Sequence, residues 1–145
     1  MTVKINNELT DEKELNELYP FFTAIAREAS RLEGYSDGEI SIALVDDEKI
    51  KQLNNNFRGR CEITDVLSFP IDDELLGDIV ISVEAARRQA DEYNHSFKRE
   101  LCYLVTHGLL HIFGYNHKNP GDKKQMRQKE ERILSKVNLE RDREE

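Results

Sequence analysis

The chain of 145 residues is long enough for one domain with a buried core, and its formal net charge of −8 argues against an overall basic nucleic-acid-binding protein. Hydrophobic residues make up 38% and charged residues 34%. No apolar run approaches the ~20 residues that a membrane-spanning helix needs, so we expect no membrane association. Two cysteines provide no disulfide framework and the first residues lack a signal-peptide pattern, so we expect a cytoplasmic protein.

Strand and helix patterns alternate through the first half of the chain. We expect a short strand at residues 3–5, a helix at 11–33, a strand at 39–45, and a short helix from Asp46 or Asp47 to about Asn55. Pro20 should kink the long helix or begin a new one, and Gly34 should end it. Residues 56–65 are predicted to form a polar loop.

The second half begins with strands and ends with helices. We expect a brief strand at residues 66–69, a turn at 72–74, a buried strand at 76–82, and helices at 82–93, 97–113 and 121–138. This order predicts an α+β fold, in which a mixed sheet of about four strands packs with about five helices. No linker or internal repeat divides the chain, so residues 1–145 are expected to form a single domain.

Three of the four histidines lie within eleven residues of one another. His107 and His111 are four residues apart, which places them on one face of a helix. Gly114 can adopt the left-handed conformation that ends a helix, so His117 can return to the same point. Three imidazoles with a fourth position open are typical of a catalytic zinc site. The spacing therefore predicts one Zn²⁺ per chain, held by His107, His111 and His117.

The same spacing of histidines occurs in a class of zinc proteases, but two features of those enzymes are missing here. Their general-base glutamate follows the first histidine, where this chain has Gly108. Their downstream methionine turn has no counterpart either, since Met126 lies in a charged, helix-like stretch. The sequence thus supplies the metal ligands without the base that cleaves peptides.

A polar loop with two arginines forms the second unusual stretch. It contains Arg58 and Arg60 and leads through Thr64 and Asp65 into a strand. The guanidinium group of Arg58 can bind a phosphate with two parallel hydrogen bonds, and the alternative for this residue is an ordinary surface salt bridge. Thr64 and Asp65 could cap or brace the loop. Residues 118–136 add seven basic and three acidic side chains, which we expect to form a solvated helix face near the metal.

Together these two stretches resemble the YbeY family of bacterial zinc-dependent endoribonucleases. The resemblance rests on Asn54, Phe57 and Arg58, on the run from Thr64 to Pro70, on Gly77, Asp78 and Ile79, and on the histidine motif from His107 to His117. Two positions depart from the family pattern. Asn116 stands where the family usually has Asp, which removes a negative charge beside the third histidine, and Ile63 stands where the family usually has Pro.

The resemblance implies a single-strand-specific, zinc-dependent endoribonuclease that acts in ribosomal RNA maturation at the 16S 3′ end and in ribosome quality control. It implies single-stranded ribosomal RNA and the ribosome or its proteins as partners, and no DNA. Arg58 is then a catalytic and substrate-binding residue, Arg60 a second substrate-binding residue, and Asp65 a candidate for proton transfer. Bulk water and the RNA 2′-hydroxyl are the other candidates for proton transfer.

Two further functions fit parts of this pattern. One is a zinc hydrolase of another substrate class, acting on a peptide or small molecule. The other is a non-catalytic ribosome-assembly factor with a structural zinc ion, which would need a fourth protein ligand. His95 and Cys102 are the remaining soft ligands for that role, although Cys102 points roughly 140° away from His107 on the helix.

Overall fold

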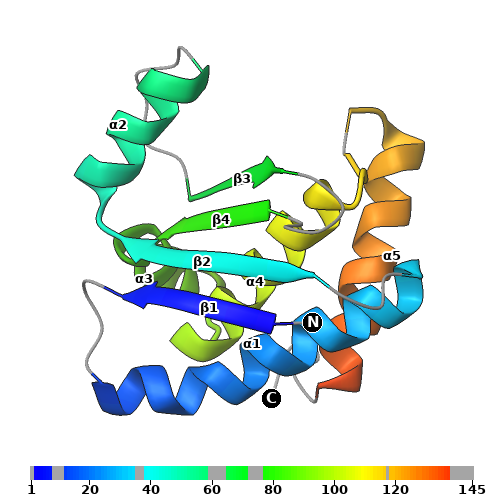
Figure 1. Ribbon diagram of the computed structural model, residues 1–145, viewed down its shortest axis with the longest axis horizontal. Helices are drawn as coiled ribbons and strands as arrows, with labels where there is room; N and C mark the ends of the chain where they lie inside the picture. The colour runs from blue at the N-terminus through cyan, green and yellow to red at the C-terminus, as the bar shows by residue number, and fades with distance from the viewer. Residues whose placement is uncertain are drawn as a thin grey trace.

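The computed structural model describes residues 2–7, 12–34, 38–58, 65–71, 77–116 and 118–137. At its centre is one four-stranded sheet in the order β1-β2-β4-β3 (Figure 1). The strands are β1 (Thr2–Asn7), β2 (Glu39–Val45), β3 (Val66–Pro70) and β4 (Gly77–Ser82). β1 and β4 both pair with β2 in parallel, whereas β3 pairs with β4 antiparallel. The predicted mixed sheet is therefore confirmed.

Five helices accompany the sheet in the described part of the chain. They are α1 (Glu12–Glu33), α2 (Asp47–Arg58), α3 (Val83–Tyr93), α4 (Phe97–Ile112) and α5 (Pro120–Lys136). Figure 1 shows α1 running beside β1, and α2 standing apart from α1 and α5. The α+β class and the order of elements agree with the sequence-based expectation. No helix among these residues is long and apolar enough to cross a membrane.

Several predicted boundaries were wrong, and each has a physical reason. β1 spans six residues rather than three because its pairing with β2 continues from Thr2 to Asn7. α2 extends to Arg58, so the first three residues of the predicted loop are helical. Pro70 belongs to β3, where it pairs with Gly77. The edge position of β3 tolerates a residue that has no N–H donor. The predicted turn at 72–74 lies outside the described residues.

α1 continues through Pro20 instead of dividing there. A proline inside a helix removes one backbone hydrogen bond and crowds the preceding turn. The apolar face of the helix offsets this cost, because it places a continuous row of side chains in the core: Leu18, Phe22, Ile25, Ala26 and Ala29. Gly34 follows the helix with a φ of 80°, as predicted for the residue that ends it.

The two faces of the sheet carry different cores. Ile40, Ile42 and Leu44 of β2 face the larger one, with apolar residues of α1, α4 and α5. Val45 and Val80 face a smaller cluster with Ile50 of α2. α4 is central to the larger core, since it packs against α1, α3 and α5 and against β3 and β4. Three helices and two strands therefore surround α4, the helix that carries His107 and His111.

Candidate metal centre

His107 and His111 of α4 point their rings at each other. Their Nε2 atoms are 3.1 Å apart, and the ring planes are nearly perpendicular. The Nδ1 atom of each ring faces an oxygen. His107 Nδ1 lies 2.6 Å from a carboxylate oxygen of Glu130 in α5, and His111 Nδ1 lies 3.0 Å from the backbone carbonyl oxygen of Tyr115. The predicted meeting of the two histidines on one face of a helix is therefore present.

These contacts assign the ring protons. A carbonyl oxygen only accepts, so His111 Nδ1 must carry the proton and donate it to Tyr115. An ionised carboxylate only accepts as well, so His107 Nδ1 donates to Glu130. In the neutral form of both rings, the two Nε2 lone pairs then face each other without a hydrogen between them.

This pair of nitrogens fits a zinc ion. Two nitrogen ligands ~2.0–2.1 Å from a tetrahedral zinc lie about 3.3 Å apart, close to the 3.1 Å seen between His107 and His111. A carboxylate or carbonyl behind each ligating imidazole is also the usual arrangement at zinc sites. His117, the third predicted ligand, lies outside the described residues. Among the residues that are described, no group of three or more His, Cys, Asp or Glu side chains could hold a metal.

Gly114 ends α4 in the left-handed conformation that the sequence predicts. Gly114 has a φ of 102°, and its N–H donates to the His111 carbonyl oxygen. The Tyr115 N–H donates to the Leu110 carbonyl oxygen, which completes a Schellman motif. Beyond it, Asn116 Oδ1 accepts the Lys118 N–H at 3.1 Å. The neutral amide oxygen of Asn116 makes this contact, which does not require the negative charge of an Asp at this position.

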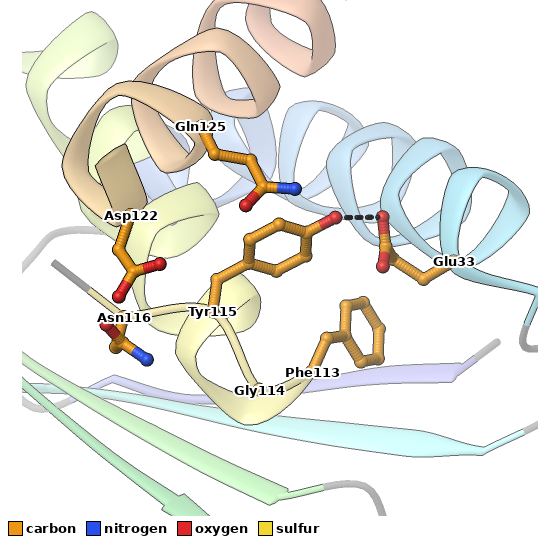
Figure 2. A pocket seen from close by; sticks show the side chains of 7 residues that line it. All are labelled: Glu33, Phe113, Gly114, Tyr115, Asn116, Asp122 and Gln125. Atoms are coloured by element: carbon orange, nitrogen blue, oxygen red, sulfur yellow. Dashed lines mark hydrogen bonds between the residues drawn. The ribbon is translucent and has the colours of Figure 1, made fainter.

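Tyr115 ties this turn to the end of α1. Its hydroxyl donates to Glu33 Oε2 at 3.0 Å, and Lys129 Nζ of α5 lies 3.5 Å from the same oxygen. Figure 2 shows the ring of Tyr115 beside Gln125, with its hydroxyl directed at Glu33. Glu33, Tyr115 and Gln125 line a hollow of about 280 Å³ together with Phe113, Gly114, Asn116 and Asp122. Three helices therefore fix the residue whose carbonyl orients His111.

Gly108 is closely packed against the sheet. A Cβ atom built on it would lie 3.0 Å from Ile79 Cγ2 of β4, closer than nine in ten real contacts. A glutamate at this position, where zinc proteases carry their base, would require the Ile79 side chain to shift by a few tenths of an ångström. The close approach of α4 to β4 thus leaves little room for a side chain here.

The face of α4 that carries the histidines continues toward its N-terminus with polar groups. The ring of Tyr103 lies 5.8 Å from that of His107. Burial raises the pKa of Tyr103 to about 12, helped by the negative charges of Glu130, Glu100 and Asp65. Burial also raises the pKa of Glu100, and the Asp65 carboxylate adds to that rise. Asp65 is thus close enough to α4 for its charge to act on two side chains of this face.

Asp65 is the one predicted catalytic residue whose side chain is described. It is half-buried at the start of β3, and its Oδ2 accepts a hydrogen bond from Gln89 Nε2 of α3 at 3.1 Å. Its backbone oxygen accepts the Ser82 N–H. These two contacts hold the residue that directly precedes β3, whereas the loop that it was predicted to cap or brace lies outside the described residues. Arg58 ends α2, but its side chain, Arg60, Ile63 and Thr64 lie outside the described residues.

Glu130 was missed by the sequence reasoning, which treated residues 118–136 as a solvated helix face. Most basic side chains of α5 are indeed exposed, yet Glu130 is only 5% exposed. It lies four residues after Met126 and three before Ile133, both of which are buried. A carboxylate at a core position of an amphipathic helix was the available signal, because buried charges need a partner.

Of the two cysteines, Cys102 is the one that the structure describes, and it lies away from this site. Cys102 is fully buried in the core, and burial raises the pKa of its thiol to about 12. Cys102 packs in the larger core, five residues before His107 on α4, which turns it roughly 140° away from that histidine around the helix. This position separates it from the face of α4 that carries His107 and His111. Cys61 lies outside the described residues.

Comparison with known proteins gives consistent matches. Residues 2–138 match the family model described as Endoribonuclease YbeY. The chain is 46% identical to Endoribonuclease YbeY of Clostridioides difficile over 121 residues, which cover 76% of this chain and 79% of that protein. It is 43% identical to the protein of the same name from Desulforamulus reducens, over 97% of this chain and 100% of that one. The solution structure of a Thermotoga maritima protein matches with a TM-score of 0.68 and 31% identity, covering 93% of this chain and 88% of that one.

Proposed function

The chain belongs to the endoribonuclease YbeY family of metal-dependent RNA phosphodiester hydrolases, and on that basis we propose that it is a single-strand-specific, zinc-dependent endoribonuclease. Its proposed substrate is ribosomal RNA, which it matures at the 16S 3′ end. The observation that carries the proposal is the pair of Nε2 atoms 3.1 Å apart, each on a ring whose Nδ1 is engaged by an oxygen.

In this proposal His107, His111 and His117 hold one Zn²⁺ per chain. The two described rings present lone pairs toward one point, and the Schellman turn at Gly114 brings the chain back before position 117. When bound, zinc supplies a Lewis acid that activates water or polarises a phosphoryl oxygen. The protein holds its ligands in a fixed geometry through Glu130 on one side and Tyr115 on the other.

Arg58 is proposed to bind the scissile phosphate and neutralise the charge that builds on it, and Arg60 to bind a neighbouring phosphate. Arg58 is the last residue of α2, and Arg60 comes two residues later in the sequence. Asp65 is proposed to accept or relay a proton. Its hydrogen bond from Gln89 fixes the carboxylate, and its charge reaches Tyr103, the neighbour of His107.

The wider setting follows from the same family membership. Residues 1–145 are proposed to act as one metal-dependent endoribonuclease domain in the cytoplasm. The ribosome or its proteins are the proposed partners, through which the enzyme contributes to ribosome quality control. The acidic surface favours contact with basic ribosomal proteins, while the arginines of residues 58–60 provide local positive charge for RNA.

The first test combines metal analysis with RNA cleavage on the same samples. Wild type is expected to contain about one zinc per chain and to cleave single-stranded RNA. His111→Ala should lose both, because two of three ligands cannot hold the ion tightly. His95→Ala, which removes a histidine outside the proposed ligand set, is the matched control. Stoichiometric zinc without cleavage in wild type would remove the nuclease and favour the assembly-factor alternative.

A further inference from the structure

Glu130 lies in the core of the protein, with 5% of its surface exposed. It sits on α5, on the same face as the buried Met126, Ile133 and Leu134. An ionised carboxylate in such a place is costly unless it is paired and hydrogen-bonded. Its partner is the Nδ1 atom of His107, 2.6 Å away, on a helix 23 residues earlier in the chain. This distance is short even for a hydrogen bond to a charged group.

We propose that Glu130 is a positioning residue for the metal centre, which acts through His107; the inference rests on the proposed zinc site. The carboxylate fixes three properties of the ring. It holds the proton on Nδ1, so the lone pair that would ligate a metal lies on Nε2. It sets the direction of the Nε2 lone pair toward His111. Its negative charge makes the imidazole a stronger donor to a cation.

The second histidine provides an internal comparison. His111 donates to the neutral carbonyl of Tyr115, in the turn that directly follows its own helix. His107 receives its acceptor from a different helix, and that acceptor carries a full charge. The docking of α5 on α4 therefore determines the orientation of one metal ligand. A change at Glu130 should affect metal affinity more than it affects the fold of α4.

The surroundings of the His107–Glu130 pair argue against direct contact between Glu130 and RNA. The His107 side chain is 20% exposed and that of Glu130 is 7% exposed, so the carboxylate is the more shielded partner of the pair. Tyr103 flanks the ring at 5.8 Å. Since Glu130 is itself shielded, it is placed to orient a ligand rather than to contact RNA.

Two substitutions separate the charge of Glu130 from its hydrogen bond. Glu130→Gln keeps the shape and an acceptor oxygen but removes the charge, and should weaken zinc binding about tenfold. Glu130→Leu removes both and should weaken it about 100-fold. Glu131→Gln changes the neighbouring, more exposed carboxylate of the same helix and should leave zinc affinity unchanged. Circular dichroism and thermal unfolding establish that each variant is folded.

Zinc affinity is measured on the full chain by competition with a chromophoric chelator, and ligand geometry by the absorption spectrum of the Co²⁺-substituted protein. Cleavage of single-stranded RNA is then followed against free zinc. The Glu130 variants should need more zinc for half-maximal activity. They should also shift the Co²⁺ spectrum, an effect that a merely structural ion pair would not cause.

The outcomes distinguish the two proposals. Wild-type zinc affinity in a folded Glu130→Gln and Glu130→Leu protein overturns the role of Glu130 and leaves the nuclease proposal standing. Failure of wild type itself to bind zinc overturns both. If Glu130→Leu does not fold, Glu130→Gln alone decides, because it is nearly the same size and keeps an acceptor.

Discussion

At the scale of single residues, the ring orientation and the position of the ring proton in His107 and His111 depend on the oxygen atoms that face their Nδ1 atoms. The spacing of His107 and His111 places the two rings on one face of α4, where their Nε2 atoms lie 3.1 Å apart. The protonation of each ring depends on an acceptor that the spacing does not reveal. Tyr115 is close in sequence and its carbonyl could be anticipated from the turn, whereas Glu130 could not.

Arg58 is the residue on which the proposed phosphate chemistry depends. Arg58→Gln removes a fixed positive charge and should lower kcat on single-stranded RNA about 10²- to 10³-fold, the usual cost of losing one group that stabilises transition-state charge. Zinc content should not change, since the arginine is not a ligand. Lys49→Gln, an exposed cation on the same helix, is the control. Cleavage by Arg58→Gln at the wild-type rate would exclude a catalytic role for the arginine.

At the scale of secondary structure, hydrogen bonds at the ends of helices and between helices hold the elements around the candidate metal centre. The Schellman turn closes α4, Asn119 caps α5, and Ser82 caps α3. Asp47 joins α2 to α3. It accepts hydrogen bonds from Ser82 Oγ at 2.7 Å and from Arg88 Nη1 at 2.8 Å, and its own N–H donates to Glu84. This joint fixes the first turn of the helix that ends at Arg58.

Asp47→Asn tests this joint through its pH dependence. The hydrogen bond from Arg88 holds the pKa of Asp47 below its ordinary value of 3.8, against the opposing effect of burial. A lowered pKa stabilises the folded state above the unfolded-state pKa, and this contribution is lost as the pH falls through the folded-state pKa.

The variant should therefore be less stable than wild type by about 1 kcal/mol at pH 7, a figure reduced by the exposure of Arg88. The difference should persist at pH 5 and shrink below about pH 4. Chemical denaturation at each pH measures it. Glu48→Gln removes a neighbouring exposed charge and should show little effect. A stability difference that does not vary with pH would contradict the assigned charge interaction.

At the scale of the whole molecule, an acidic protein is proposed to bind a polyanion. Residues 1–50 carry a net charge of −7 and residues 118–136 one of +4, so the charge is unevenly distributed along the chain. Because the protein has a net charge of −8, its overall electrostatic field repels RNA, and binding must depend on a few cationic side chains close to the phosphates.

This view predicts a weak dependence of RNA affinity on salt. Arg60→Gln should lower the slope of log Kd against log salt concentration by about 0.7, the value for one phosphate contact on a single strand. The measurement uses a His111→Ala background so that the RNA is not cleaved. Arg27→Gln on α1 makes the same change in net charge and should leave the slope unaltered. Equal effects of the two variants would mean that overall charge, not a local contact, governs binding.

The sequence by itself determined the features that arise from local interactions. These are the order of strands and helices, the buried alternation of β2, the caps at Ser82 and Gly114, and the placement of His107 and His111 on one face of α4. Each depends on residues within about one helical turn or along one strand, so their spacing is visible in the chain. The roles of these histidines as metal ligands, and of Arg58, Arg60 and Asp65, stay predictions.

Only the tertiary structure decided the features that join distant segments. The strand order β1-β2-β4-β3, the place of α2 on the face opposite α1, the contact of Gly108 with Ile79, and the bond from His107 to Glu130 all depend on long-range packing. The hydrophobic effect drives that packing and is not directional. Many arrangements of the helices around the sheet would therefore bury the apolar residues of the same sequence. The shape of the whole core selects among them, and that selection places the Glu130 carboxylate beside His107.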